Sequence, residues 1–277
     1  MRRRSFLKLL AGAAAGAVLP VPAARASVER VPVPPTVMLH ARQAHLDNLP
    51  RLLDWLAERN YTPITYRALW DHLSGSRSLP ARPAIITIDD LTLVRGSSNF
   101  AFIARMIDVL LERAVPAVVG IITEPIVTCD DGRLVQLKEQ DDALWGCAAV
   151  WQASGIELAT HTTSHRNLAE VGITPDVLRH EIGASAALIA ARTGQPVGTL
   201  ILPFGNGASD SHAGRLRAPI AEVCRACGIG IVAGVGGGRA ALEPAPPDAQ
   251  PIYFVGRVGP AADAYDGIFW EITHWHR

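Results

Sequence analysis

Acidic and histidine side chains stand in two short stretches of this 277-residue chain, each at the end of an apolar run. Residues 84–87 lead into Asp89 and Asp90, whose side chains point to opposite sides if they continue a strand, so one can bind a metal and the other a proton. His161 and His165 are four residues apart, and on one helical turn they share a face that can hold one ion. Capping aspartates and surface histidines are the alternatives for each stretch alone, but two histidines and one aspartate make an open ligand set for a divalent metal.

A third stretch, residues 200–207, runs Leu-Ile-Leu-Pro-Phe-Gly-Asn-Gly. Proline and two glycines allow the backbone to approach a ligand closely. A free backbone N–H here can stabilise an oxyanion, although the stretch by itself indicates only a turn.

The elements that must position these residues alternate between strand and helix, which predicts an α/β fold with a parallel sheet covered by helices. Seven or eight strands in about 240 residues indicate a closed or nearly closed barrel, in which functional residues follow the carboxyl ends of strands. We expect strands at residues 36–40, 84–87, 117–122, 156–160, 199–202, 229–232, 251–255 and 268–272. We expect helices at residues 49–60, 66–73, 100–114, 143–153, 175–192 and 218–227.

Residues 1–26 have the pattern of an export signal. They carry five basic residues and no acid, and an apolar run at residues 9–19 is too short to cross a bilayer comfortably. The sequence Arg-Arg-Ser-Phe-Leu-Lys at residues 3–8 resembles a twin-arginine signal, with an ordinary secretory signal as the alternative. We therefore expect an exported protein, periplasmic or extracellular, with a linker at residues 27–35, one domain at residues 36–277, and no membrane span after cleavage.

The charge balance changes when that signal is removed. The whole chain has 26 basic and 26 acidic residues. Without residues 1–26 the balance is 21 basic against 26 acidic residues, a net charge of about −5. Because a nucleic-acid-binding protein needs a basic excess, we expect no nucleic-acid partner.

In this order and spacing, the three stretches resemble the NodB-homology polysaccharide deacetylases, also called carbohydrate esterase family four. The family motifs are Thr-Phe-Asp-Asp-Gly, His-Ser/Thr-x-x-His and Arg/Tyr-x-Pro-Tyr/Phe-Gly. The resemblance covers residues 36–275, and it implies a single-domain distorted (β/α) barrel with about seven parallel strands. The implied activity is metal-dependent removal of N-acetyl groups from an amino-sugar polymer.

The resemblance also assigns roles to residues of the first two motifs. Asp89 becomes the catalytic base, and Asp90, His161 and His165 become the metal ligands. Zinc is the metal that this ligand set favours, and cobalt, nickel or manganese also suit it. The implied partner is an acetylated polysaccharide or oligosaccharide.

The third motif and the C-terminus supply the remaining implied roles. The backbone N–H of Phe204, next to Pro203, becomes an oxyanion donor. The family's last motif is Leu/Ile-x-His, and Ile272-Thr273-His274 matches it. His274 then becomes the general acid, and Ile272 lines the acetyl pocket.

Some positions depart from the family pattern. Leu91 replaces the glycine of the first motif, where we expect it to fill space beside the substrate. Ile201 stands where many members have the arginine that orients the base, so Arg166 or Arg257 becomes the candidate replacement. These departures leave two alternatives open, an O-acetyl esterase on the same scaffold and a catalytically weak carbohydrate-binding protein.

Overall fold

A computed structural model describes residues 30–128, 133–137, 141–205, 214–236, 239–243, 249–259 and 265–275. The expected export signal at residues 1–26 lies outside the described residues. No helix within the described ranges is both long and apolar enough to cross a membrane.

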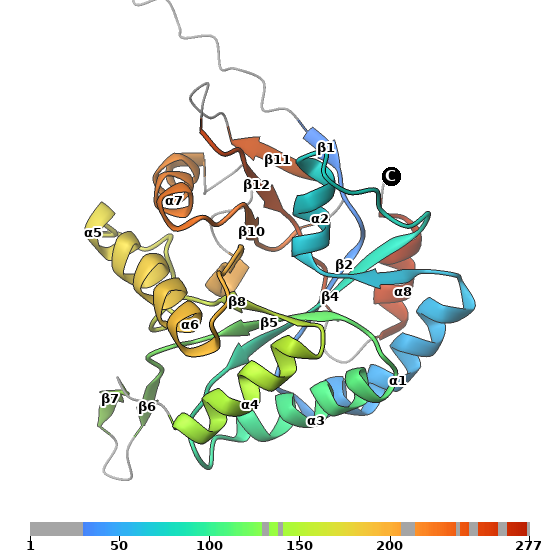
Figure 1. The fold of residues 1–277 in the computed structure, drawn as a ribbon, viewed down its shortest axis with the longest axis horizontal. Helices are drawn as coiled ribbons and strands as arrows, with labels where there is room; N and C mark the ends of the chain where they lie inside the picture. The colour runs from blue at the N-terminus through green and yellow to red at the C-terminus, as the bar shows by residue number, and fades with distance from the viewer. Residues whose placement is uncertain are drawn as a thin grey trace, which may run out of the picture.

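The centre of the fold is a curled sheet of ten strands in the order β1-β11-β12-β10-β9-β8-β5-β4-β2, with β3 paired to β4 (Figure 1). Seven successive strands, β2, β4, β5, β8, β9, β10 and β12, are parallel, which confirms the expected fold class. The strand bounds are β1 (Arg30–Pro32), β2 (Thr36–Leu39), β3 (Thr62–Ile64), β4 (Pro83–Leu91), β5 (Ala117–Ile121), β8 (Ile156–Thr160), β9 (Thr199–Ile201), β10 (Ile231–Ala233), β11 (Arg239–Glu243) and β12 (Ile252–Val255).

Helices other than α2 pack on the outside of this sheet, whereas α2 packs against its inner apolar core (Figure 1). The helices are α1 (Gln43–Glu58), α2 (Tyr66–Leu73), α3 (Ser98–Glu112), α4 (Asp142–Ala153), α5 (Pro175–Leu178), a π-helical turn (Arg179–Ala184), α6 (Ser185–Thr193), α7 (Gly214–Cys227) and α8 (Tyr265–Thr273). A small antiparallel pair, β6 (Ile126–Thr128) and β7 (Leu134–Gln136), and a 3₁₀ turn (Pro203–Gly205) complete the described elements.

The two ends of the parallel sheet meet at Val258. Met38 N–H donates to the Val258 carbonyl at 2.8 Å, and Val258 N–H donates to the Thr36 carbonyl at 2.9 Å. This parallel bridge joins the chain just after β12 to β2. It holds Arg257, the residue before Val258, close to β2, the first strand of the parallel sheet.

Strand residues divide between two apolar cores because successive side chains point to opposite faces. Ile85 packs inside the curled sheet with Val118, whereas Ile86 packs outside against the helices. The outer core is the larger, and it takes the leucine stripe of α1 that includes Leu49 and Leu52. Burial on both faces explains why β4 and β5 are continuous apolar runs in the sequence.

Two expectations for the chain ends are wrong. Residues 268–272 form part of helix α8 rather than a strand, because Ile268 and Ile272 are four residues apart and bury the same helical face. Residues 30–35 are no free linker, because β1 pairs with β11 and Val33 is buried. The ordered domain therefore includes Arg30–Pro35.

Gly256 is the position where barrel closure is most sensitive to one added methyl group. A Cβ at Gly256 would lie 1.7 Å from the Gly236 carbonyl oxygen, so the backbone beside Arg257 would have to move. We expect Gly256→Ala to lower the free energy of unfolding by about 1–3 kcal/mol, measured by denaturant unfolding. The control is Gly267→Ala in α8, where a Cβ meets nothing within 4 Å and stability should not fall. Equal stability of wild type and Gly256→Ala would contradict this packing.

Candidate metal centre and catalytic site

A β-bulge at the end of β4 separates the two aspartates. Ile88 pairs with Val119 and Leu91 with Ile121, so two β4 residues oppose one residue of β5. Asp90 takes a positive φ of 72°, a strained conformation for a residue with a side chain. Bulges re-aim side chains, and this one directs the two neighbouring carboxylates to different partners.

Asp90 meets both histidines of the second motif. Its Oδ1 atom lies 3.3 Å from His161 Nε2 and 3.3 Å from His165 Nε2. One ligand atom from each of the three residues lies within 4.8 Å of the others. The structure therefore brings together the three residues that the sequence predicts as metal ligands.

The histidines reach this position from a loop rather than from the helical turn that the sequence suggests. His161 directly follows β8, and Thr162 and His165 both have positive φ values, 69° and 59°. The Thr162 hydroxyl accepts a hydrogen bond from His165 N–H at 3.0 Å, which closes a tight turn. This turn places the second imidazole beside the first, with ring centroids 4.7 Å apart.

The ring of His161 is oriented for a ligand role. Its Nδ1 atom lies 2.9 Å from the Ile201 carbonyl, which can only accept, so Nδ1 carries the proton and Nε2 faces Asp90. Gly120 leaves room for this ring, because a Cβ there would lie 3.2 Å from His161 Cβ. Two imidazole nitrogens and one carboxylate oxygen with an orienting hydrogen bond fit a divalent ion of the zinc type.

Asp90 and His161 each stabilise the charged form of the other. Burial alone would raise the pKa of Asp90, but hydrogen bonds from His161 and His165 hold that pKa well below its usual range. Burial alone would lower the pKa of His161, but its hydrogen bond to Asp90 and the charges of Asp89 and Asp90 raise it overall. The site is therefore an electronegative cluster that favours a cation, either a proton or a metal ion.

Asp89 pairs with Arg257 rather than with the two histidines. Arg257 Nη1 donates to Asp89 Oδ1 at 2.6 Å and to the Thr87 hydroxyl at 3.0 Å, and Nε donates to the Gly234 carbonyl at 3.0 Å. Both side chains are buried. Burial alone would lower the pKa of Arg257, and the charge of Asp89 raises it. Of the two candidate arginines, Arg257 is thus the one that pairs with Asp89, whereas Arg166 is paired with Glu170 at 3.5 Å.

Phe204 lies beside the histidines, as the third motif requires. The residue is 63% exposed, and the centroid of its ring lies 4.8 Å from that of the His165 ring. Phe204 has a positive φ of 59°, and Pro203 before it is buried. Gly205 permits the turn, because a Cβ there would lie 2.2 Å from Val235 Cγ2.

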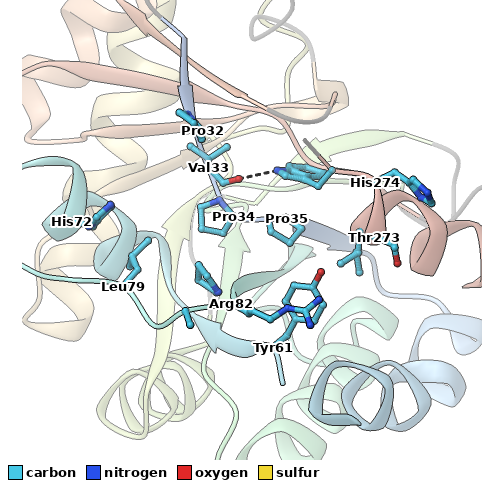
Figure 2. A pocket seen from close by; sticks show the side chains of 14 residues that line it. Pro32, Val33, Pro34, Pro35, Tyr61, His72, Leu79, Arg82, Thr273 and His274 are labelled. Atoms are coloured by element: carbon cyan, nitrogen blue, oxygen red, sulfur yellow. Dashed lines mark hydrogen bonds between the residues drawn. The ribbon is translucent and has the colours of Figure 1, made fainter. Parts of the chain in front are cut away.

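Two predicted site residues lie elsewhere. Ile272 and His274 line a cavity of about 520 Å³ with Pro83, the first residue of β4 (Figure 2). The two aspartates lie at the other end of that nine-residue strand. His274 Nδ1 donates to the Trp270 carbonyl at 2.8 Å, and its ring stacks on Trp270. Helix α8 ends on the opposite side of the barrel from the candidate metal ligands, so the predicted acid and acetyl-pocket roles do not fit these two residues.

Leu91 is also placed differently from the expectation. It is fully buried and packs in the outer core between the sheet and the helices. The bulge turns its side chain away from the barrel opening, so it takes no room from a substrate.

Sequence reasoning missed Glu181. This buried residue lies in the π-helical turn between α5 and α6. Its carboxylate accepts hydrogen bonds from the Thr163 hydroxyl at 2.8 Å, Ser164 N–H at 3.0 Å and the Ser164 hydroxyl at 2.7 Å. An acidic residue inside an expected amphipathic helix gives no sequence signal for this role, because only the fold shows that it braces the histidine loop.

Comparison with known proteins decides the family. The sequence model of the family described as "Polysaccharide deacetylase" matches residues 76–220, more than half of the chain. The chain belongs to the polysaccharide deacetylase family. No curated protein sequence matches it closely enough to be counted.

Solved structures of deacetylases share the fold of this polysaccharide deacetylase. IcaB from Ammonifex degensii has a TM-score of 0.60 and 19% identity, over 88% of this chain and 98% of IcaB. The deacetylase domain of BpsB from Bordetella bronchiseptica has a TM-score of 0.55 and 18% identity, over 82% and 96%. Streptococcus pyogenes deacetylase PplD, in complex with acetate, has a TM-score of 0.54 and 17% identity, over 76% and 88%.

Loss of the Glu181 carboxylate should loosen the histidine loop. We expect Glu181→Gln to weaken zinc binding by about tenfold or more, measured by competition with a chelator, because an amide nitrogen cannot accept these bonds. Glu170→Gln is the matched control, since it removes an exposed carboxylate close to the same loop and should bind zinc like the wild type. If Glu181→Gln bound zinc with the same affinity as Glu170→Gln and the wild type, Glu181 would not position the loop.

Proposed function

We propose that this polysaccharide deacetylase is an exported, metal-dependent hydrolase that removes N-acetyl groups from an amino-sugar polymer. The proposal rests on one observation, which is that the two adjacent aspartates have different partners. Asp90 lies against His161 and His165, whereas Asp89 is held by Arg257. That arrangement supports one carboxylate for a metal ion and one for a proton. The export proposal rests on the basic and apolar pattern of residues 1–26.

The proposed ligands are Asp90, His161 and His165, and zinc is the ion that suits them best. A bound divalent ion would lower the pKa of its water toward about 7 and would polarise the acetyl carbonyl. The three protein ligands leave coordination positions open for that water and for the substrate.

The other residues move protons and hold charge. Asp89 accepts a proton from the attacking water as general base, and Arg257 keeps its carboxylate oriented and its charge balanced. The backbone N–H of Phe204, on the exposed rim, donates to the oxyanion of the tetrahedral intermediate. Acetate and a free amine are the products.

His40 is the residue that we propose as the general acid in place of His274. It lies at the carboxyl end of β2, next to the end of β4, where its N–H donates to His45 Nδ1 at 2.7 Å. Burial lowers the pKa of His40 overall and the charges of Asp89 and Asp90 oppose that shift, so His40 is electrostatically coupled to both aspartates. An imidazole beside the base is well placed to protonate a leaving amine.

Substitutions at the two motifs should separate catalysis from metal binding. We expect Asp89→Asn to lower acetate release from N-acetylglucosamine oligomers by about 10²–10⁴-fold with the metal content unchanged, and His161→Ala to lose both metal and activity. Asp108→Asn, an exposed residue of α3, is the control. Full activity of Asp89→Asn would overturn the assignment of the base. Faster acetate release from acetyl-xylan would favour the O-acetyl esterase, and no release from any glycan in the presence of zinc would favour a binding protein.

The two histidines can be compared directly. We expect His40→Ala to lower kcat by about 10²-fold or more and His274→Ala to leave it unchanged, because only His40 lies at the catalytic end of the barrel. The rate of acetate release at saturating substrate gives kcat for both variants. Loss of activity in His274→Ala alone would restore the role that the sequence motif implies.

A further inference from the structure

His45 is a buried polar residue on the apolar face of a helix. It is the third residue of α1, and only 2% of it is exposed. The other buried residues of α1 are leucines, namely Leu46, Leu49, Leu52, Leu53 and Leu56. Because burial of a polar ring costs free energy unless the ring finds hydrogen-bond partners, the contacts of His45 indicate what this histidine does that another leucine could not.

The His45 ring binds the main chain of His40. His40 N–H donates to His45 Nδ1 at 2.7 Å, and the two ring centroids are 5.9 Å apart. Nδ1 also lies 3.1 Å from the His40 carbonyl oxygen, and the shorter contact to N–H makes Nδ1 an acceptor. The third residue of a helix is the position from which Glu or Gln reaches back to a main-chain N–H in a capping box. His45 reaches back in a similar way, and it ties the first turn of α1 to the end of β2.

The main chain around His40 is held at three points. The His40 carbonyl accepts from Arg42 N–H at 2.7 Å, which closes a turn directly after β2. Two residues before His40, Met38 N–H donates to the Val258 carbonyl at 2.8 Å. The third point is the bond from His40 N–H to His45. Because these bonds fix the backbone of His40, they also fix the direction in which its side chain leaves the end of β2.

Helix α8 packs against His45 and restrains its ring. The buried Tyr265 ring meets the His45 ring edge-on, at an interplanar angle of 81° and a centroid distance of 6.1 Å. The Tyr265 hydroxyl donates to the His45 carbonyl at 3.4 Å. Close by, Arg51 Nη2 and Asp266 Oδ1 form an ion pair at 2.7 Å that joins α1 to α8. A side chain whose rotamer is restrained by packing can in turn hold a functional residue in one geometry.

We propose that His45 is a positioning residue that holds His40 in place to protonate the leaving amine. This inference rests on the proposed role of His40 as general acid. In that step the C–N bond of the tetrahedral intermediate breaks while the His40 imidazolium gives its proton to the nitrogen. Solvent then returns a proton to His40 and takes one from Asp89. Because a displacement of about 1 Å can cost about 10²-fold in rate, loss of the His45 contact should slow this proton transfer.

Two substitutions at His45 and two substrates test this role. Leucine suits the apolar face of α1 but cannot accept the hydrogen bond, whereas the Oδ1 atom of asparagine can. We expect His45→Leu to lower kcat on N-acetylglucosamine oligomers about tenfold or more, with KM and zinc content unchanged, and His45→Asn to recover kcat to within about threefold of the wild type. Hydrolysis of 4-nitrophenyl acetate by both variants should stay within about twofold of the wild type, because nitrophenolate leaves without a proton.

His72→Leu is the matched control. His72 Nδ1 also binds the main chain five residues away, at the Arg77 carbonyl, but His72 lies with Pro83 at the amino end of β4. This variant should have the kcat of the wild type on both substrates. A circular dichroism spectrum of each variant confirms that it is folded before the rates are compared.

A double variant separates this inference from the proposed acid itself. If His45 acts through His40, His40→Ala combined with His45→Leu should be no slower than His40→Ala alone. Full activity of His45→Leu beside a slow His40→Ala would overturn the inference and leave the acid in place. Full activity of His40→Ala would overturn both. Equal losses on the two substrates in His45→Leu, without recovery in His45→Asn, would show that His45 only stabilises the fold.

Discussion

The candidate site at the carboxyl end of this barrel depends on the buried ion pair between Asp89 and Arg257. Both side chains are almost fully excluded from water, and removing one partner of such a pair costs about 3–5 kcal/mol. Arg257 follows β12, the last parallel strand, and Asp89 lies in β4. The pair therefore connects, across the interior of the barrel, two parts of the chain that are 168 residues apart. The main-chain bridge at Val258 holds Arg257 in place, so closure of the barrel also fixes the orientation of Asp89, the proposed base.

The same constraint explains the strained backbone around the site. Once Asp89 is held inside the barrel, the next residue can face the histidines only if the strand bulges, and Asp90 accordingly adopts a positive φ. Thr162, His165 and Phe204 share that conformation, which places strain where three loops converge. Glu181 compensates from the π-helical turn by binding the histidine loop at three points. Short loops with fixed hydrogen bonds thereby present two imidazoles and one carboxylate to a single point.

Much of this arrangement can be predicted from the sequence, because it follows from local patterns. Apolar runs ending in Asp89-Asp90 and before His161 indicate parallel strands, and their carboxyl ends must meet in a barrel. The roles that depend on distant contacts cannot be predicted in this way. His274 matches a motif by spacing, yet α8 carries it to the other end of the barrel, since Ile268 and Ile272 bury a helical face. The sequence leaves Arg166 and Arg257 as equal candidates, and only the closure of the sheet places Arg257 on Asp89.

The division between the two aspartates is the central claim, and a crystal structure of the protein soaked with zinc tests it most directly. Anomalous scattering at the zinc edge should locate one ion bound to Asp90, His161 Nε2 and His165 Nε2, with Asp89 still paired to Arg257 and free of the ion. An ion bound by Asp89, or an ion bound elsewhere while these three residues remain unliganded, would contradict the account.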